Sequence, residues 1–195
     1  MTNLNGLNIQ RQCQKNLSQL NRVLYLCRKK LTNESLKTIY YSLAYSHIAY
    51  CVAIWSGTWT RHLNSVIIAQ KHTIRTIMCT PRDPRSIPLF IENQKLSFKF
   101  IFKYFSAIVA FKYWNFDYCS VIFTKAQNQW NLRNNMNKSA VPFFRSTRGQ
   151  KSIFDLTPFT WNSLTSELRQ LTSVYSFKYQ LKIYLENEQS YLLEI

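Results

Sequence analysis

The chain has 195 residues, of which 46% are hydrophobic and 15% aromatic, and this composition excludes a disordered chain and can build one domain or two small ones. Lys and Arg number 25 against nine Asp and Glu, so the formal net charge is +16 at pH 7, which attracts polyanions. Five widely spaced cysteines, an odd number, imply no disulfide framework, and they give no local ligand pair for zinc. A reducing, intracellular setting is expected, either nucleus or cytoplasm.

The first third of the chain predicts three helices. The first covers about residues 9–31 and ends in a basic run, which suits the negative end of a helix dipole. The second follows a cap at Thr32 or Asn33, and its apolar stripe is Leu36, Tyr40, Leu43, His47, Cys51 and Ile54. The third covers about residues 60–79 and buries Leu63, Ile67, Ile74 and Ile77. We expect an antiparallel bundle.

The middle of the chain is aromatic and then irregular. The segment Lys95–Trp114 is aromatic on most sides, which predicts a helix packed between neighbours. Within it, the stretch Phe98–Trp114 is interrupted by Lys99, Lys103 and Lys112 and is shorter than the ~20 apolar residues of a membrane span, so no membrane partner is expected. Residues 117–152 are rich in Asn and Gln with little periodicity, which indicates a long loop or a short ribbon.

Two helices are predicted at the C-terminal end. Thr157 followed by Pro158 predicts a helix start, and a last helix runs from about Thr172 to Glu188. The expected fold class is therefore mainly α. A helical bundle over residues 1–92 precedes a region over 93–195 that holds the aromatic helix, an irregular loop-rich segment and a C-terminal helix pair.

Six short motifs follow one another in a fixed order. They are Tyr40-x-Ser42-Leu43, then His47 and Tyr50 with Trp55, Gln70-Lys71 with Arg75, Ser146-Thr147-Arg148, Trp161-Asn162-x-Leu164, and residues 177–182. From about residue 11 to 186, their order and spacing resemble the region downstream of the polymerase palm in reverse transcriptases of non-LTR (LINE-type, jockey-like) retrotransposons. The chain departs from the family pattern at Ser46, Ser56, Ala69 and Thr165.

The resemblance implies a thumb-like bundle and a connection region that grip RNA and DNA, as an RNA–DNA hybrid, behind a palm domain elsewhere in the full-length element. Reverse transcription needs carboxylates that converge on two metal ions, and the family supplies an Asp-Asp pair. This sequence has no adjacent carboxylate pair, and its three glycines are too far apart for a phosphate-cradling loop. We expect no polymerase activity from this chain alone, no catalytic residue, no metal site and no cofactor.

The positive charge is concentrated in the first four fifths of the chain. Residues 1–154 hold 22 basic and 4 acidic side chains, a net +18, whereas residues 155–195 hold 3 and 5. Residues 1–33, 35–82 and 118–154 contain no acid, so the field is not cancelled locally. Because phosphate neutralisation supplies most sequence-independent affinity, this pattern favours nucleic acid, with a solvated basic surface as the alternative.

Three clusters are candidate nucleic-acid contacts. On the third helix, Lys71 and Arg75 project side by side as a phosphate clamp, next to Gln70. The other two clusters are Arg145, Thr147, Arg148 and Lys151, and the run Arg28, Lys29 and Lys30, which extends a basic rail of Arg11, Lys15 and Arg22 along the first helix. A solvated face is the alternative for the cluster on the third helix, and a simple turn is the alternative for the cluster at 145–151. Trp161 lies on an apolar stripe, which favours core packing over base stacking.

The function expected from the sequence is that of a C-terminal fragment of a retrotransposon RNA-directed DNA polymerase, which binds primer–template nucleic acid without its own catalytic palm. The alternative is a decayed or domesticated transposon fragment that acts as a protein-interaction scaffold. The aromatic helix motivates this alternative, because its surface would be exposed without a palm and would favour association.

Overall fold

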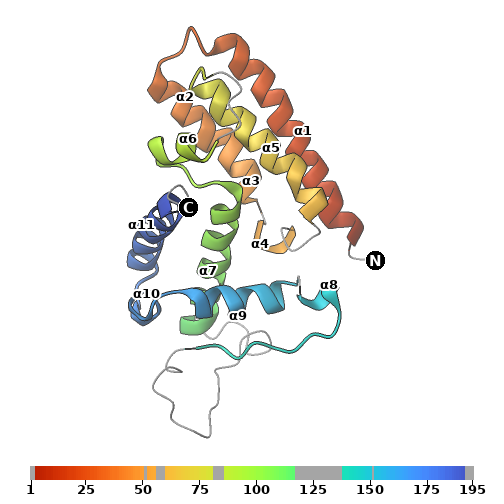
Figure 1. The fold of residues 1–195 in the computed structure, drawn as a ribbon, viewed down its shortest axis with the longest axis vertical. Helices are drawn as coiled ribbons and strands as arrows, with labels where there is room; N and C mark the ends of the chain where they lie inside the picture. The colour runs from red at the N-terminus through yellow and green to blue at the C-terminus, as the bar shows by residue number, and fades with distance from the viewer. Residues whose placement is uncertain are drawn as a thin grey trace, which may run out of the picture. The chain divides into compact units, whose positions relative to one another are not determined.

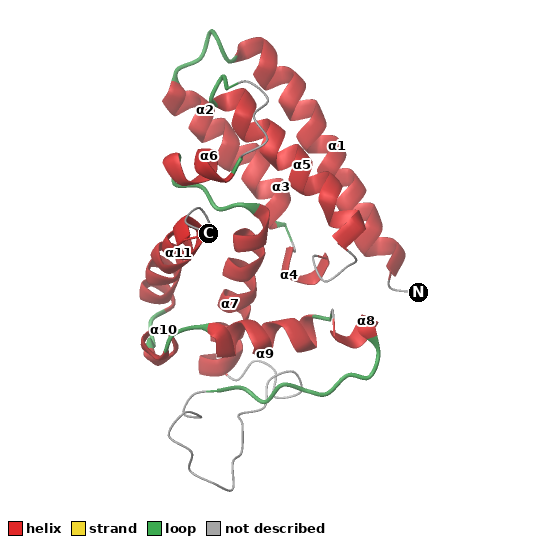
Figure 2. Cartoon of the chain, viewed as in Figure 1, coloured by secondary structure: helices red, strands yellow, loops and turns green. Residues whose placement is uncertain are grey.

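The computed structural model of the chain describes residues 3–50, 52–55, 60–80, 86–116, 138–150 and 152–191. Helices make up most of these residues and no strand lies among them, which confirms the mainly α fold class (Figure 1 and Figure 2). The chain divides into two compact units, Met1–Phe102 with Glu186–Ile195, and Lys103–Leu185. The sequence analysis divides the chain at residue 92 instead.

A three-helix bundle forms most of the first unit. Its parts are α1 (Asn3–Cys27), a continuous run of α2 (Asn33–Ile39), η1 (Tyr40–Tyr45) and α3 (Ser46–Ala49), and then α5 (Thr60–Ile77). α1 and α5 run in one direction and the middle run in the opposite one, which is the predicted antiparallel arrangement (Figure 1). Leu17, Leu24 and Ile74 are fully buried in its core.

The first helix ends earlier than its sequence predicts. α1 stops at Cys27, because the Lys30 N–H reaches back only three residues to the Cys27 carbonyl, at 2.8 Å, and tightens the chain into a turn. The basic run 28–30 therefore lies beyond the helix. Thr32 then caps α2 as predicted, since its hydroxyl accepts a hydrogen bond from the Ser35 N–H at 3.3 Å.

A π-helical turn changes the register of the middle run. The η1 segment holds more residues per turn than an α-helix, so the buried positions recur every four residues. They are Leu36, Tyr40, Ala44, Ile48 and Val52. The predicted stripe is wrong at Leu43, which is 45% exposed, and at the half-buried His47, because it assumed an unbroken α-helical period. The side chains of Cys51 and Ile54 lie outside the described residues.

α5 and α6 (Ile87–Glu92) each end in a left-handed turn of the same type, the Schellman motif. At the end of α5, the N–H of Cys79 donates to Thr76 O at 3.4 Å and that of Thr80 donates to Arg75 O at 3.2 Å. At the end of α6, the N–H of Gln94 donates to Ile91 O at 2.9 Å and that of Lys95 donates to Phe90 O at 2.8 Å. Cys79 and Gln94 have φ values of 52° and 51°, a region that favours glycine.

A buried amide holds the segment after α6, residues 95–97, to the bundle. The Gln70 side chain on α5 is 1% exposed, and its Nε2 donates to the Leu96 carbonyl and to the Tyr40 hydroxyl, each at 3.1 Å. Lys95, itself 2% exposed, has its ammonium 5.0 Å from the ring centroids of Tyr40 and Tyr41. The aromatic faces thus compensate part of the cost of burying the charge.

A second buried amide holds the same segment from the C-terminal end of the chain. Gln189 lies in the last turns of α11 (Val174–Tyr191) and is 2% exposed. Its Oε1 accepts from the Ser97 N–H at 2.8 Å, and its Nε2 donates to the Lys95 carbonyl at 2.9 Å. The side chain therefore satisfies two backbone groups that have no partner in regular secondary structure.

The second unit contains most of α7 (Phe98–Phe116), followed by α8 (Thr147–Gln150), α9 (Ile153–Ser163), α10 (Ser166–Gln170) and most of α11. The prediction that a helix starts at Thr157 is wrong. α9 begins after Ser152, whose carbonyl accepts from the Leu156 N–H at 3.0 Å. Pro158 lies inside the helix, where it has no N–H to donate to the carbonyl four residues earlier.

Aromatic rings form the core of the second unit. Trp161 of α9 is fully buried and stacks on Trp114 of α7, with ring centroids 5.5 Å apart. Phe111 stacks on Phe177 of α11 at 4.2 Å. Because these rings contact one another from three helices, they fix α7, α9 and α11 within this unit. The expectation that Trp161 is a core residue is confirmed.

We expect Gln189→Ala to lower the free energy of unfolding by about 1–3 kcal/mol, because a buried N–H and a buried carbonyl lose their partner. Gln180, which is exposed on the same helix, provides the matched control, and Gln180→Ala should change stability by less than about 0.5 kcal/mol. Urea unfolding monitored by circular dichroism measures both. Equal effects of the two variants would show that the buried amide contributes nothing specific.

Cys79→Gly and Gln94→Gly should each raise the free energy of unfolding by about 0.5–1 kcal/mol, since glycine adopts the left-handed conformation without a Cβ penalty. Asn93→Gly is the control. Asn93 lies one residue earlier at φ −96°, and its amide donates to Leu89 O at 2.8 Å, so that variant should be less stable. If Cys79→Gly and Gln94→Gly both lowered the free energy of unfolding, the left-handed conformation assigned to these two residues would be contradicted.

Candidate nucleic-acid interface

The outer face of α1 carries three exposed basic side chains, Arg11, Lys15 and Arg22. Spacings of four and seven residues bring them to one side of the helix. The opposite side packs into the bundle through Cys13 and Leu17. No Asp or Glu occurs in α1, so nothing on the helix itself cancels this charge. We call Arg11, Lys15 and Arg22 the α1 basic face.

The basic run after α1 lies in a turn rather than on the helix. Lys29 and Lys30 are exposed there. The Arg28 guanidinium lies over the Tyr25 ring, 4.3 Å from its centroid, which is a cation–π contact. Tyr25 is itself 61% exposed. The three residues of the run therefore lie close together in sequence and near the surface, but they do not continue the face of the helix.

The structure separates the three predicted contacts on α5. Lys71 and Arg75 are half-buried and lie one turn apart on the same flank, beside the 53% exposed Ile68. Gln70 is a correction to the sequence analysis. It is 1% exposed and its amide donates to groups inside the bundle, so it is not accessible to a ligand. The sequence gives no sign of this, because the partner carbonyl belongs to Leu96, far along the chain.

The third predicted cluster is described in part. Arg145 and Thr147 are exposed, whereas the side chain of Arg148 and the whole of Lys151 lie outside the described residues. The Ser146 hydroxyl accepts from the Gly149 N–H at 3.2 Å and so caps the short helix α8. Of the Ser-Thr-Arg motif, Ser146 thus has a structural role within the chain.

The Trp-Asn motif is also structural. The Asn162 Oδ1 accepts from the Ser139 N–H and its Nδ2 donates to the Ser139 carbonyl, both at 2.8 Å. The amide therefore pairs with backbone as a neighbouring strand would, and it holds residue 139 against α9. Together with the buried Trp161, it anchors the segment that leads to Arg145.

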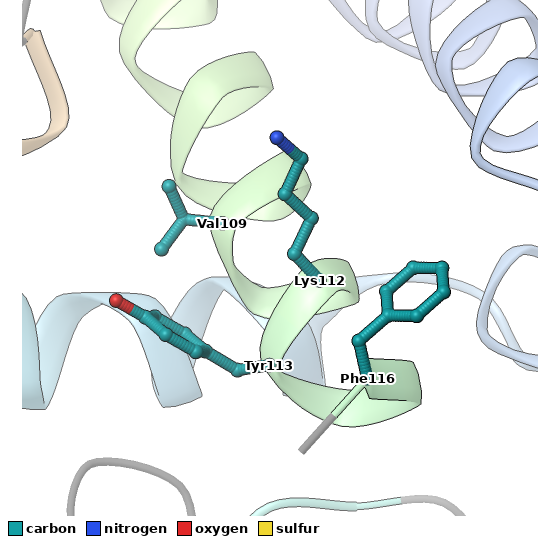
Figure 3. Close-up of a pocket in the computed structure, with 4 residues that line it drawn as sticks. All are labelled: Val109, Lys112, Tyr113 and Phe116. Carbon is teal, nitrogen blue, oxygen red and sulfur yellow. The ribbon is translucent and has the colours of Figure 1, made fainter. Parts of the chain in front are cut away.

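A pocket of about 440 Å³ lies beside the end of α7 (Figure 3). The described residues that line it are Val109, Lys112, Tyr113 and Phe116. Lys112 and Phe116 extend on one side of the helix, while Tyr113 and Val109 extend on the other (Figure 3). The sequence analysis did not include these residues among its candidates, since they belong to a helix that it interpreted as packed on most sides.

Burial raises the pKa of two groups that do not belong to these surfaces. It raises the pKa of the Cys13 thiol to about 11 and raises the pKa of Tyr40, so both groups stay protonated at neutral pH. Among the described residues, no group of three His, Cys, Asp or Glu side chains is arranged to hold a metal ion. No helix in the described part of the chain is long and apolar enough to cross a bilayer.

No protein-family model, curated protein or solved structure matches the chain. The arrangement of the exposed basic side chains therefore carries the functional argument.

Proposed function

We propose that the chain binds nucleic acid as the thumb and connection region of a non-LTR retrotransposon reverse transcriptase. In this proposal it grips an RNA–DNA hybrid while a palm domain in the full-length element performs polymerisation. The observation that carries the proposal is the α1 basic face, Arg11, Lys15 and Arg22, on a helix that contains no acid. Motif order supports it, as does the net +18 of residues 1–154.

Electrostatic attraction to phosphates would supply affinity for nucleic acid without sequence selectivity. Each cation that neutralises a phosphate releases condensed counterions, so the α1 basic face would contribute up to three such contacts. Lys71 and Arg75 would add two on α5, where the Arg fork binds phosphate oxygens in pairs and the Lys acts as a point charge. Side chains that carry charge to backbone phosphates fix position on a duplex without reading its bases.

The proposed role is binding without catalysis. The sequence has no adjacent carboxylate pair to hold two metal ions, so polymerisation by this chain alone is not part of the proposal. Its five cysteines, of which Cys13, Cys27 and Cys79 are free in the described part of the chain, fit a reducing compartment. Nucleus and cytoplasm both fit.

The alternative function, a protein-interaction scaffold, has less support once the helix is described than it had from the sequence alone. The sequence argument relied on an uncovered aromatic helix, yet Phe98, Ile101 and Phe111 of α7 are each at most 5% exposed within the chain. Part of the surface that would favour association is thus packed within the chain, whereas Phe116 is 49% exposed. A scaffold remains the outcome indicated if no nucleic acid binds.

The test is binding to a labelled RNA–DNA hybrid over a salt series. We expect Arg11→Ala/Lys15→Ala and Lys71→Ala/Arg75→Ala each to weaken binding and to reduce the slope of log affinity against log salt by about 0.9 per lost contact. Lys178→Ala/Lys182→Ala is the matched control, because it removes the same charge from an exposed pair, also four residues apart, in the acidic last fifth of the chain.

The control should reduce the slope less than either test variant. If wild type binds without any dependence on salt, or not at all, the proposal fails. If the control weakens binding as much as the two test pairs do, the chain responds only to its total charge, and the α1 basic face is not the interface.

A further inference from the structure

The segment between Ser139 and α8 presents an exposed aromatic ring. Phe143 is 86% exposed, more than any other large hydrophobic side chain in the described part of the chain. Phe is among the residue types most often found fully buried, and Val141, two residues earlier, is also 47% exposed, so this segment presents apolar surface. The basic clusters chosen from the sequence did not include it.

Both ends of this segment are fixed to the second unit. At one end the Asn162 amide pairs with the N–H and carbonyl of Ser139, each at 2.8 Å. At the other end, Gln150 Nε2 donates to the Phe144 carbonyl at 3.1 Å. The two anchors set the position of the backbone that carries Phe143.

The second anchor includes a close packing contact. The Phe144 side chain fills the space beside Gly149, where an added Cβ would lie 2.7 Å from Phe144 Cβ. Only glycine fits there without displacing the ring. The Phe144 side chain thus packs against α8, whereas its neighbour Phe143 is exposed to solvent. The exposure of Phe143 therefore follows from the packing of Phe144.

The charge around Phe143 matches a polyanion. Arg145 follows two residues later and is exposed, and residues 118–154 contain no acid. An aromatic ring next to an arginine suits a nucleobase that stacks on the ring while its phosphate meets the guanidinium. Paired bases in a duplex cover one another, so a ring of this kind reads bases in single strands.

We propose that Phe143 is a stacking platform for single-stranded nucleic acid, with Arg145 contacting the adjacent phosphate. This inference rests on the proposed function and assigns a separate single-strand site to the second unit, whereas the proposed hybrid-binding residues of α1 and α5 belong to the first. An RNA template ahead of the hybrid and a displaced DNA strand present the same chemistry, bases on a phosphate backbone. The platform accepts either by stacking, and the 2′-hydroxyl is what distinguishes them.

The experiment measures binding of labelled single strands of about 12 nucleotides, one RNA and one DNA, and of the RNA–DNA hybrid, by the full chain. Phe143→Ala should weaken single-strand binding by roughly 5- to 100-fold, the usual loss for one stacked base, and leave hybrid binding unchanged. Phe143→Trp should restore it. Tyr175→Ala is the matched control, because Tyr175 is 82% exposed on α11, and it should bind like wild type.

The salt dependence separates stacking from charge. Phe143→Ala should keep the wild-type salt slope, since it removes no phosphate contact, whereas Arg145→Ala should lower the slope by about 0.7 for a single strand. Comparable affinities of RNA and DNA strands indicate that the 2′-hydroxyl makes no contact, and a preference for RNA that disappears in Phe143→Ala assigns a contact to the 2′-hydroxyl at the same platform.

Three results overturn the platform. If wild type binds hybrid and single strands but Phe143→Ala is unchanged, or if Tyr175→Ala loses as much affinity, the platform is wrong while the proposed function stands. If wild type binds no nucleic acid, both fail. Matching circular dichroism spectra and melting temperatures for all variants check that they fold alike, which the exposure of Phe143 predicts.

Discussion

The grip of two buried amides on residues 95–97 is the interaction on which the first unit depends. Gln70 and Gln189 come from helices far apart in the sequence, and both satisfy backbone groups of one short segment. Leaving those groups buried and unpaired would cost more than the bonds themselves contribute. Because the segment leads directly into α7, the amides fix where that helix begins.

The second unit uses the same device in a different place. Asn162 pairs with the backbone of Ser139 and, with Trp161 packed beneath it, anchors the segment that carries Phe143 and Arg145. Gln70 and Asn162, which belong to two of the six motifs, therefore hold irregular backbone in position. Of the side chains proposed to bind nucleic acid, Lys71 directly follows Gln70 on α5, and Phe143 and Arg145 belong to the segment that Asn162 holds.

Sequence periodicity predicted the helices and much of their packing. It placed Ile74 and Ile77 in the core, and it located the α1 basic face by spacing alone. It missed the register beyond Tyr40, because a π-helical turn shifts the pattern by one residue in a way that composition does not reveal. It also misassigned Gln70, since a polar residue beside two cations gives no sign that its partner is a carbonyl 26 residues later.

Photo-cross-linking to strands that carry 4-thiouridine, followed by peptide mapping, tests the central claim most directly. The account predicts cross-links from an RNA–DNA hybrid to peptides of α1 around Arg11 and Lys15, and from single-stranded RNA to the peptide that contains Phe143. The acidic last fifth, including the exposed face of α11, should give few. Cross-links confined to α11, or none on any peptide, would contradict it.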